Sequence, residues 1–355
     1  YRHIMMITVN RLMFSGCVSS VIRISKMNEL LPNGTEWDIY HGDAIPHMLR
    51  DMPEESVDFS VYSPPFPAMY AYHDSVSDIG NVDAMEGEAA VHLSFMFNGI
   101  YRVLKPGRVA IVHVVQLPRM KRSGGVGLCD FRGTNIRLGE RAGLIYEYDW
   151  MIRRNPQSQA LRTRSRELQF AGLESDRAAS RGTLNDYLIK FRKPGVNQVP
   201  IRDWEQEFDD DGEAVGGKSL IHNTQVTRNE WIKWAEGCWD DLSETDTLNT
   251  AVAKSENDTR HICPMNLSVI RRCVLLYSNP CEIVFSPFAG IGSEGFVSLG
   301  GKSPKTGVSI HDPRRFYGCE LKDEYYEQAK KNLAAACANR ASAKAMSLFD
   351  DDEGE

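Results

Sequence analysis

The stretch Val57-Asp58-Phe59-Ser60-Val61-Tyr62-Ser63-Pro64-Pro65-Phe66 decides how the rest of the chain is interpreted. Its first six residues are typical of a short buried strand. The strand must end at the two prolines, because proline has no amide hydrogen and a fixed φ. Pro64 also restricts Ser63 to extended geometry. The sequence therefore predicts a rigid elbow at the carboxyl end of a strand, with the Ser63 hydroxyl on one side and the Phe66 ring on the other.

This elbow offers what a reaction at an aromatic amine requires. An exocyclic amino group is a poor nucleophile because its lone pair is delocalised into the ring. We expect the Ser63 hydroxyl and the Pro64 carbonyl to accept hydrogen bonds from the amino protons, and Phe66 to stack on a base that has left the duplex. Ser63, Pro64, Pro65 and Phe66 are thus the candidate catalytic residues. A plain proline turn is the alternative, because turns use proline freely.

Length and composition set the frame for this hypothesis. A chain of 355 residues with 42% hydrophobic residues can bury a full core in one large domain or two. It has no run of 18 uncharged apolar residues, so no membrane span is predicted. The first 24 residues do not have a signal-peptide layout. The 8 cysteines form no Cys-x-x-Cys pair, so we expect free thiols rather than zinc ligands or disulfides.

Charge is distributed unevenly along the chain. The net charge is -7, yet residues 101–195 contain 19 lysines and arginines against 8 aspartates and glutamates. The acidic residues gather instead in 203–213 and 350–355. A solvated basic face is one explanation, but so large a local surplus in an acidic protein favours a surface that faces phosphates. The candidate phosphate contacts are Lys121, Arg122, Arg153, Arg154, Arg162, Arg164, Arg166 and Arg181.

Strand-like and helix-like segments alternate along the chain. Strands are predicted at 37–40, 57–62, 108–115, 148–152, 187–192, 282–285 and 315–320, and helices at 44–52, 84–104, 135–142, 266–277, from after Gly295 to about 299, and 322–336. Residues 196–230 are expected to be looped, and disorder is expected beyond Asn339. The tryptophans at 231, 234 and 239 are interpreted as packing residues on one helix face. The alternation predicts an α/β sheet with helices on both faces.

A second motif lies between the last two predicted strands. Gly290-Ile291-Gly292 separates a strand from a helix, where glycines let the backbone approach a cofactor and a helix amino end favours an anion. Glu320 ends the following strand, where an acid can hold two ribose hydroxyls. Dinucleotide-binding enzymes share these features. The elbow at Ser63 has no role in hydride transfer, which favours a different cofactor.

Taken together, the elbow at 63–66 and the segment Phe288-Ala289-Gly290-Ile291-Gly292 resemble the target-amine and S-adenosyl-L-methionine (AdoMet) motifs of the DNA amino-methyltransferases, which modify cytosine N4 or adenine N6. The catalytic motif comes first and a long insert separates the two, as in the permuted β group of phage and bacterial enzymes. The resemblance covers about residues 37–333. It implies a Rossmann-like AdoMet-dependent methyltransferase sheet.

The resemblance also implies roles for individual residues. Asp43 would lie near the adenine of AdoMet and Glu320 would bind its ribose. The residues that would hold the methionine end or wrap the cofactor are His261, Cys263, Pro264, Phe288, Ala289, Gly290 and Gly292. The implied division is an N-terminal extension (1–34), a catalytic half (35–118), a basic target-recognition insert (119–259), an AdoMet-binding half (260–340) and an acidic disordered tail (341–355).

The base and the partners follow from the same resemblance. Serine stands at position 63 where adenine enzymes usually have aspartate, and Phe66 replaces the commoner tyrosine. The serine form favours cytosine N4, with adenine N6, an RNA or protein-amide substrate, and a non-catalytic DNA-binding protein as the alternatives. Double-stranded DNA is the expected partner, and the expected location is the cytoplasm of a bacterium or phage-infected host. A homodimer is expected from the resemblance alone, and the sequence does not indicate whether a restriction partner exists. His311-Asp312, in the loop 300–314, has no assigned role.

Overall fold

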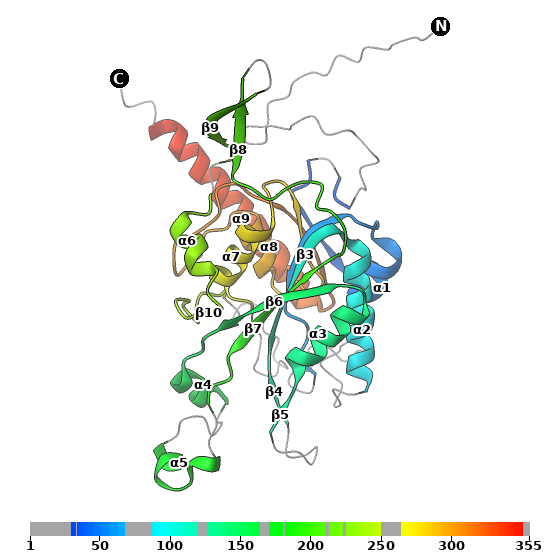
Figure 1. The fold of residues 1–355 in the computed structure, drawn as a ribbon, viewed down its shortest axis with the longest axis vertical. Coiled ribbons are helices and arrows are strands. Elements are labelled where there is room, and N and C mark those ends of the chain that lie inside the picture. The colour runs from blue at the N-terminus through cyan, green and yellow to red at the C-terminus, as the bar shows by residue number, and fades with distance from the viewer. Residues whose placement is uncertain are drawn as a thin grey trace.

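An eight-stranded sheet forms the centre of the computed structural model, which describes residues 30–32, 34–67, 87–119, 127–163, 170–179, 182–209, 213–222, 225–249 and 264–350 (Figure 1). The strand order is β1-β12-β11-β2-β3-β7-β6-β10. Every neighbouring pair is parallel except the two pairs that β7 forms. The strands are β1 (Trp37–His41), β2 (Val57–Tyr62), β3 (Leu104–Val115), β6 (Ile145–Ile152), β7 (Asp186–Arg192), β10 (Cys238–Trp239), β11 (Ile283–Ser286) and β12 (Arg315–Glu320).

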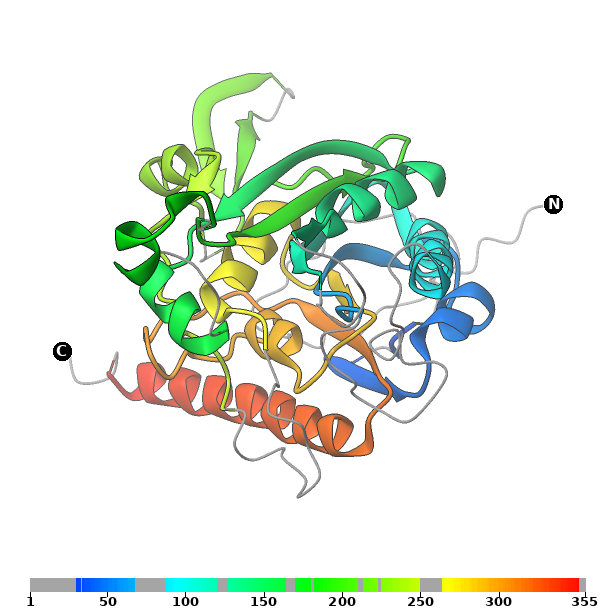
Figure 2. The ribbon, with the colours of Figure 1, turned by 90° about the horizontal axis from the view of Figure 1, so that it is seen from below.

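Helices cover both faces of this sheet, because alternate residues of each strand point to opposite sides. One face packs on α7 (Leu267–Tyr277), α8 (Ser293–Ser298) and α9 (Asp323–Asp350). The other packs on α1 (Ala44–Pro46), the π-helical turn His47–Asp51, α2 (Glu88–Val103) and α3 (Phe131–Arg141). On β2, Val61 belongs to the first core and Tyr62 to the second. Figure 2 shows α9 well separated from α2. The predicted α/β fold with helices on both faces is confirmed.

Part of the predicted recognition insert belongs to the central sheet. β6, β7 and β10 extend the sheet beyond β3, and α3 packs beside them. The remaining described elements of 119–259 are β5 (Leu128–Cys129), which pairs with β4 (Leu117–Pro118), α4 (Pro156–Thr163), α5 (Phe170–Glu174), the 3-10 turn Arg177–Ala179, β8 (Trp204–Phe208), β9 (Ala214–Leu220) and α6 (Arg228–Trp234). In Figure 1, β4, β5, α4 and α5 extend from one end of the molecule and the β8–β9 hairpin from the other.

Two segments are more ordered than the sequence suggests. The antiparallel pair β8–β9 lies within 196–230, where a loop was expected. Trp204 lies opposite Leu220 and Phe208 opposite Ala214, and the acidic composition of the segment obscured this strand. The last helix continues through Asn339 to Asp350, so the expectation of disorder is wrong for that stretch. The alanines that follow Asn332 have the highest helix propensity and explain the extension.

The tryptophans and cysteines also differ from expectation. Trp234 and Trp239 are buried, but Trp231 is 62% exposed, and Trp239 lies in β10 rather than on a helix. The prediction of one shared helix face is therefore wrong, since α6 ends at Trp234. Cys281 is disulfide-bonded, which contradicts the expectation of free thiols throughout. Sequence spacing cannot show which β-carbons lie within disulfide distance in space.

Among the described residues, no helix is both long and apolar enough to cross a membrane.

Candidate active site

The two motifs meet at one edge of the sheet. Parallel strands end at the same edge, so the segments that follow β1, β2, β3, β11 and β12 lie together there. β2 and β11 are direct neighbours, with Phe59 opposite Val284. The chain leaves β2 towards β3 on one side and leaves β11 towards β12 on the other. Ligands of α/β sheets bind in the crevice at such a switch point.

Ser63 lies at the start of the elbow, and its hydroxyl hydrogen already has a hydrogen-bonding partner. It is half-buried, and its Oγ donates a hydrogen bond to the main-chain carbonyl of His113 at 3.0 Å. A hydroxyl has one hydrogen and two lone pairs. Because the hydrogen is used on the neighbouring strand, the lone pairs are left to accept. The acceptor role for Ser63 stays a prediction.

Aromatic rings support the elbow. Phe66 is half-buried and meets Phe131 of α3 edge-on, with 5.7 Å between ring centroids. Tyr62, one residue before Ser63, is fully buried, and its hydroxyl has no hydrogen-bonding partner among the described residues. Burial raises the pKa of Tyr62 far above its ordinary value. The Tyr62 ring lies 6.1 Å from that of Phe288, which links the elbow to the loop after β11.

Main-chain hydrogen bonds tie the loops after β11, β12 and β1 together. The amide of Gly290 donates to the Glu320 carboxylate at 2.8 Å, and the amide of Lys322 donates to its other oxygen at 2.9 Å. The Ala289 amide donates to the carbonyl of Cys319, and Gly42 donates to the carbonyl of Glu320. Glu320 thus lies against Gly290, a contact that the sequence analysis did not anticipate.

The two glycines of this loop differ in their surroundings. Both have positive φ, +54° at Gly290 and +84° at Gly292. A β-carbon at Gly290 would meet no atom of the described residues within 4 Å, whereas one at Gly292 would come within 2.5 Å of Leu333. Within the described part of the chain, the backbone at Gly290 is therefore uncovered, and Gly292 packs against α9. The hydroxyls of Ser286 and Ser293 beside this loop are buried, with no partner in the described part of the chain. Open backbone, a carboxylate and unpartnered hydroxyls fit a nucleoside bearing an amino-acid end, such as AdoMet.

Of the other predicted cofactor residues, the structure describes Asp43 and Pro264. Asp43 caps α1, where its Oδ1 accepts the Ile45 amide at 2.9 Å, so one carboxylate oxygen already has a partner. Pro264 is half-buried and precedes the buried Met265 at the start of α7. His261 and Cys263 lie outside the described residues. Their predicted roles therefore stay predictions.

Sequence reasoning missed a polar cluster beside the elbow. His113 Nε2 lies 2.8 Å from a carboxylate oxygen of Asp186, and Arg154 forms an ion pair with the same oxygen. Burial alone would raise the pKa of Asp186, but the hydrogen bond from His113 and the charges of His113 and Arg154 outweigh it and lower that pKa to about 2. The available signal was a carboxylate opening a strand next to a basic segment.

A buried carboxyl was also missed. Glu294, in the first turn of α8, is 4% exposed. Burial, helped by the nearby charge of Glu320, raises the pKa of Glu294 to about 8. The carboxyl is thus mostly protonated at neutral pH, so it can donate a hydrogen bond as well as accept one.

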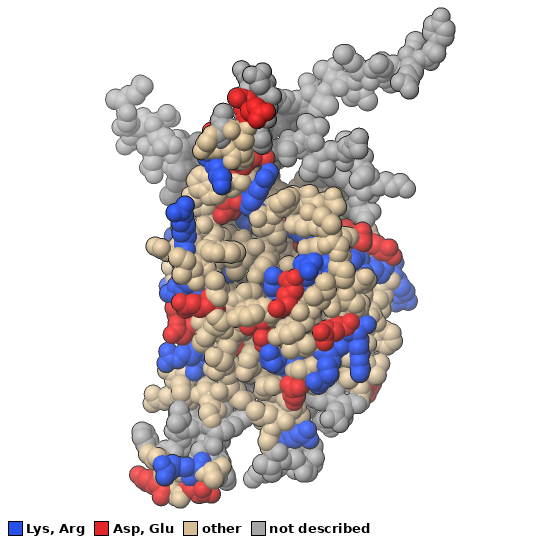
Figure 3. Space-filling view, viewed as in Figure 1, with Lys and Arg blue, Asp and Glu red and all other residues tan. Residues whose placement is uncertain are grey.

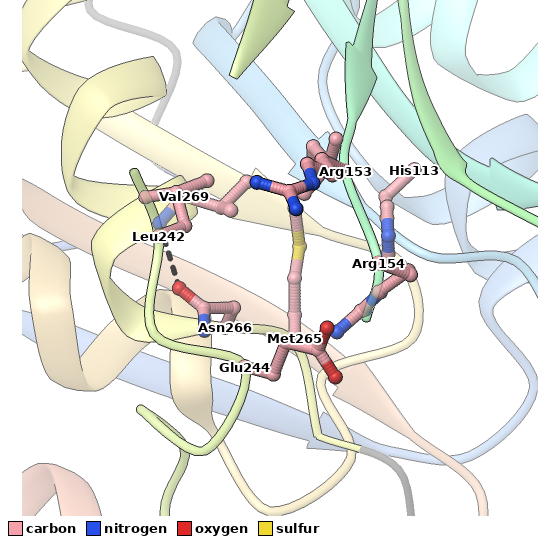
Figure 4. Close-up of a pocket in the computed structure, with 9 residues that line it drawn as sticks. His113, Arg153, Arg154, Leu242, Glu244, Met265, Asn266 and Val269 are labelled. Atoms are coloured by element: carbon pink, nitrogen blue, oxygen red, sulfur yellow. Dashed lines mark hydrogen bonds between the residues drawn. The ribbon is translucent and has the colours of Figure 1, made fainter. Parts of the chain in front are cut away.

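A small cavity adjoins the polar cluster. It has a volume of about 10 Å³, which is room for one water molecule. Figure 4 shows His113, Arg153, Arg154 and Met265 around it, with Asn266 and Val269 from the start of α7. The cavity therefore lies between the carboxyl ends of β3 and β6 and the amino end of α7.

The predicted phosphate contacts divide into three groups. Arg153 is exposed, whereas Arg154 is half-buried and paired with Asp186. Arg162 lies in α4. Lys121, Arg122, Arg164, Arg166 and Arg181 lie outside the described residues. Figure 3 shows basic and acidic side chains interspersed over the face of β6 and α3. Ion pairs such as those of Glu147 with Lys190 and Arg192 explain this, so part of the basic surplus is neutralised within the fold.

Comparison with known proteins decides the family. The DNA methylase family model (N6_N4_Mtase) matches residues 57–331, which is most of the chain. The protein belongs to this family. The matched range begins with β2, just before the elbow, and ends in α9, so it contains most of the edge of the sheet described above. The predicted resemblance is confirmed. No curated protein matches this DNA methylase.

Solved structures share the fold of this DNA methylase. A candidate DNA modification methylase of Thermus thermophilus has 18% identity and a TM-score of 0.56, covering 85% of this chain and 96% of that one. The structure of its complex with S-adenosyl-L-methionine has 19% identity and a TM-score of 0.54, and the match covers 84% of this chain and 95% of that one. PvuII DNA methyltransferase, which is cytosine-N4-specific, has 15% identity and a TM-score of 0.54, and the match covers 84% of this chain and 86% of that one. The family is AdoMet-dependent, and the cofactor-loop geometry above fits that group.

Proposed function

We propose that this DNA methylase transfers a methyl group from AdoMet to the exocyclic amino group of a base flipped out of double-stranded DNA, with cytosine N4 as the favoured target. The observation that carries the proposal is the hydrogen bond from the Ser63 hydroxyl to the His113 carbonyl. It leaves the serine oxygen as an acceptor at the edge where the cofactor loop lies. Family membership supports the DNA substrate and the methyl-transfer chemistry.

The elbow residues orient the target amine. Ser63 Oγ and the carbonyl of Pro64 each accept a hydrogen bond from one N–H of the amino group, which draws the nitrogen lone pair out of conjugation. Phe66 presents its ring to the face of the base while its edge rests against Phe131. No residue forms a covalent intermediate in this scheme, so correct orientation supplies most of the rate acceleration.

The cofactor loop and the strand ends hold AdoMet, which supplies an electrophilic methyl group when it is bound. Glu320 accepts hydrogen bonds from ribose hydroxyls while it keeps its bonds to the Gly290 and Lys322 amides. Gly290 leaves room for the cofactor against the backbone. Ser286 and Ser293 offer hydroxyls that have no partner in the described part of the chain.

The preference for cytosine rests on the neutral hydroxyl at position 63, where the adenine enzymes of the resemblance carry a carboxylate. PvuII DNA methyltransferase, which shares the fold at 15% identity, is cytosine-N4-specific. DNA would lie along the edge that carries Arg153, with the further contacts expected from the basic insert.

The proposal is tested by identifying the product. The protein is incubated with tritiated AdoMet and unmethylated duplex DNA, the DNA is digested to nucleosides, and the labelled nucleoside is identified by mass. N4-methylcytosine supports the full proposal. N6-methyladenine keeps the enzyme class and overturns the preferred base.

Two further results would overturn the function itself. If AdoMet binds but no label enters DNA, parallel reactions with RNA and with protein test the other amine and amide substrates. If AdoMet does not bind at all, a non-catalytic DNA-binding role replaces the enzyme. The Ser63→Ala variant serves as the low-activity control in each reaction.

A further inference from the structure

A chain of hydrogen bonds runs from Ser63 across three strands. The Ser63 hydroxyl at the end of β2 donates to the His113 carbonyl on β3. The imidazole of His113 contacts Asp186 at the start of β7, 2.8 Å away. Asp186 in turn pairs with Arg154, just after β6. The exposed fractions of the His113, Asp186 and Arg154 side chains are 14%, 7% and 17%.

The ionised state of Asp186 decides which atoms donate in this series of hydrogen bonds. Its lowered pKa keeps the carboxylate ionised, so it only accepts hydrogen bonds. The Nε2 atom of His113 must therefore donate to it. The other ring nitrogen, Nδ1, is buried and has no hydrogen-bonding partner among the described residues. Within the described part of the chain, Asp186 is thus the hydrogen-bonding partner that orients the His113 ring.

The link between Ser63 and His113 lies just beyond the strand ladder. The pairing of β2 with β3 ends with Tyr62 opposite Val112. Pro64 and Pro65 cannot extend it, because they have no amide hydrogen. Beyond this point the Ser63 hydroxyl donates a hydrogen bond to the carbonyl of His113, the next residue of β3. The position of the Ser63 oxygen therefore depends on where the His113 carbonyl is held.

We propose that His113 is a positioning residue for methyl transfer, which acts through Ser63. Its carbonyl keeps the Ser63 hydroxyl turned so that its lone pairs face the target amine, and Asp186 with Arg154 anchors its ring. This inference rests on the function proposed above. It assigns no contact with substrate to His113, Asp186 or Arg154.

A double-mutant cycle with Ser63 tests the inference. Asp186→Ala removes the anchor of the ring and leaves the sequence of β3 unchanged. We expect kcat for DNA methylation to fall about 10- to 100-fold, because small displacements of a positioning group have effects of that size. The affinity for AdoMet, measured by calorimetry, should change less than about twofold. In the Ser63→Ala background the same change should lower kcat by less than about twofold, because Ser63 no longer needs to be positioned.

Matched variants separate positioning from stability. Asp186→Asn keeps an oxygen for His113 and should recover most of the lost kcat. Glu147→Ala disrupts a comparable cross-strand charge cluster, with Lys190 and Arg192, at the other end of β6 and β7. It should leave kcat within about twofold of the parent. If Asp186→Ala does not fold, as judged by circular dichroism, His113→Gln takes its place in the same cycle.

Two outcomes are distinguished by this design. If the parent protein methylates DNA and the losses from Asp186→Ala and Ser63→Ala multiply, the two residues act independently and the inference is wrong. If the parent protein does not methylate DNA under any condition, the proposed function has failed, and the inference falls with it.

Discussion

The carboxylate of Glu320 accepts the main-chain amide of Gly290 at 2.8 Å, which joins the end of β12 to the loop after β11. The two residues are 30 positions apart in the chain. They meet because β11 and β12 are parallel neighbours that end at the same edge. One side chain thus holds the glycine loop at the end of the neighbouring strand.

Glu320→Gln should weaken AdoMet binding. The amide has one oxygen and one NH2 group, so one end must face a main-chain N–H of Gly290 or Lys322 with a donor instead of an acceptor. We expect Kd for AdoMet to rise about 10- to 100-fold, since a charge-assisted hydrogen bond contributes about 1.5–3 kcal/mol. Isothermal titration calorimetry measures this. Glu324→Gln, at an exposed position of α9, should leave Kd unchanged.

Ser63→Ala should remove most methylation while AdoMet binding persists. The substitution deletes the acceptor for the target amine, and we expect kcat to fall about 100-fold, as when one preorganised hydrogen-bonding group is lost from an active site. Ser56→Ala is the matched control, because the Ser56 hydroxyl donates to the carbonyl of Pro53 before the same strand begins. An equal loss of AdoMet affinity and methylation in Ser63→Ala would contradict the assigned role.

Substitution by alanine should mainly affect stability at Gly292 and cofactor binding at Gly290. In Gly292→Ala the new β-carbon collides with Leu333, so we expect the protein to lose about 2 kcal/mol or more of unfolding free energy. In Gly290→Ala the cost is limited to the positive φ, about 1 kcal/mol, but the methyl group enters the space left for the cofactor. Urea unfolding and AdoMet titration measure the two effects. The reverse ranking of stabilities would refute this assignment of the open face.

Stability should fall at alkaline pH through His222. Its ring lies 3.1 Å from Asp203 and 3.6 Å from Asp312, and these carboxylates raise the pKa of His222 to about 9. The ordinary value is 6.5. Because the folded-state pKa is the higher one, the stabilisation is complete below about pH 6.5 and is lost as the pH rises through about 9.

Thermal unfolding between about pH 6.5 and pH 9.5 measures this effect. The Tm of the parent protein should drop over that range, and the drop should be smaller in His222→Gln. His92→Gln, which affects a histidine 3.8 Å from Glu88 on α2, should keep the parental dependence. A drop of unchanged size in His222→Gln would assign the pH dependence to other groups. The contact also gives Asp312, which had no assigned role, a place in holding the β8–β9 hairpin against the loop 300–314.

Arg153 and Arg154 should separate DNA binding from internal structure. Arg153→Ala removes an exposed charge, so affinity for duplex DNA should fall and the slope of log K against log salt should decrease by about 0.9, the value for one phosphate contact. Unfolding free energy should stay within about 0.5 kcal/mol of the parent. Arg154→Ala should instead lower stability, because it leaves the buried Asp186 without its cation. Fluorescence anisotropy at several salt concentrations checks the first result. An unchanged salt slope would show that Arg153 does not contact phosphate.

The sequence by itself determined the order of the main elements and the two motifs. Prolines at 64 and 65 end a strand whatever surrounds them, and the glycines at 290 and 292 permit the positive φ that the loop adopts. These are local properties of the backbone. They indicated the α/β fold and the methyltransferase family, and both were confirmed. The roles of the individual site residues remain proposals.

Only the tertiary structure decided which residues surround the elbow. His113 and Asp186 lie on β3 and β7, and Arg154 follows β6; the adjacency of these strands depends on sheet order, which no spacing in the sequence expresses. The same holds for the charges. Basic residues that form a surplus along the chain are partly neutralised by carboxylates from other strands, as Glu147 shows with Lys190 and Arg192. Local rules describe the backbone of one segment, whereas side-chain partners depend on which segments the folded core brings together.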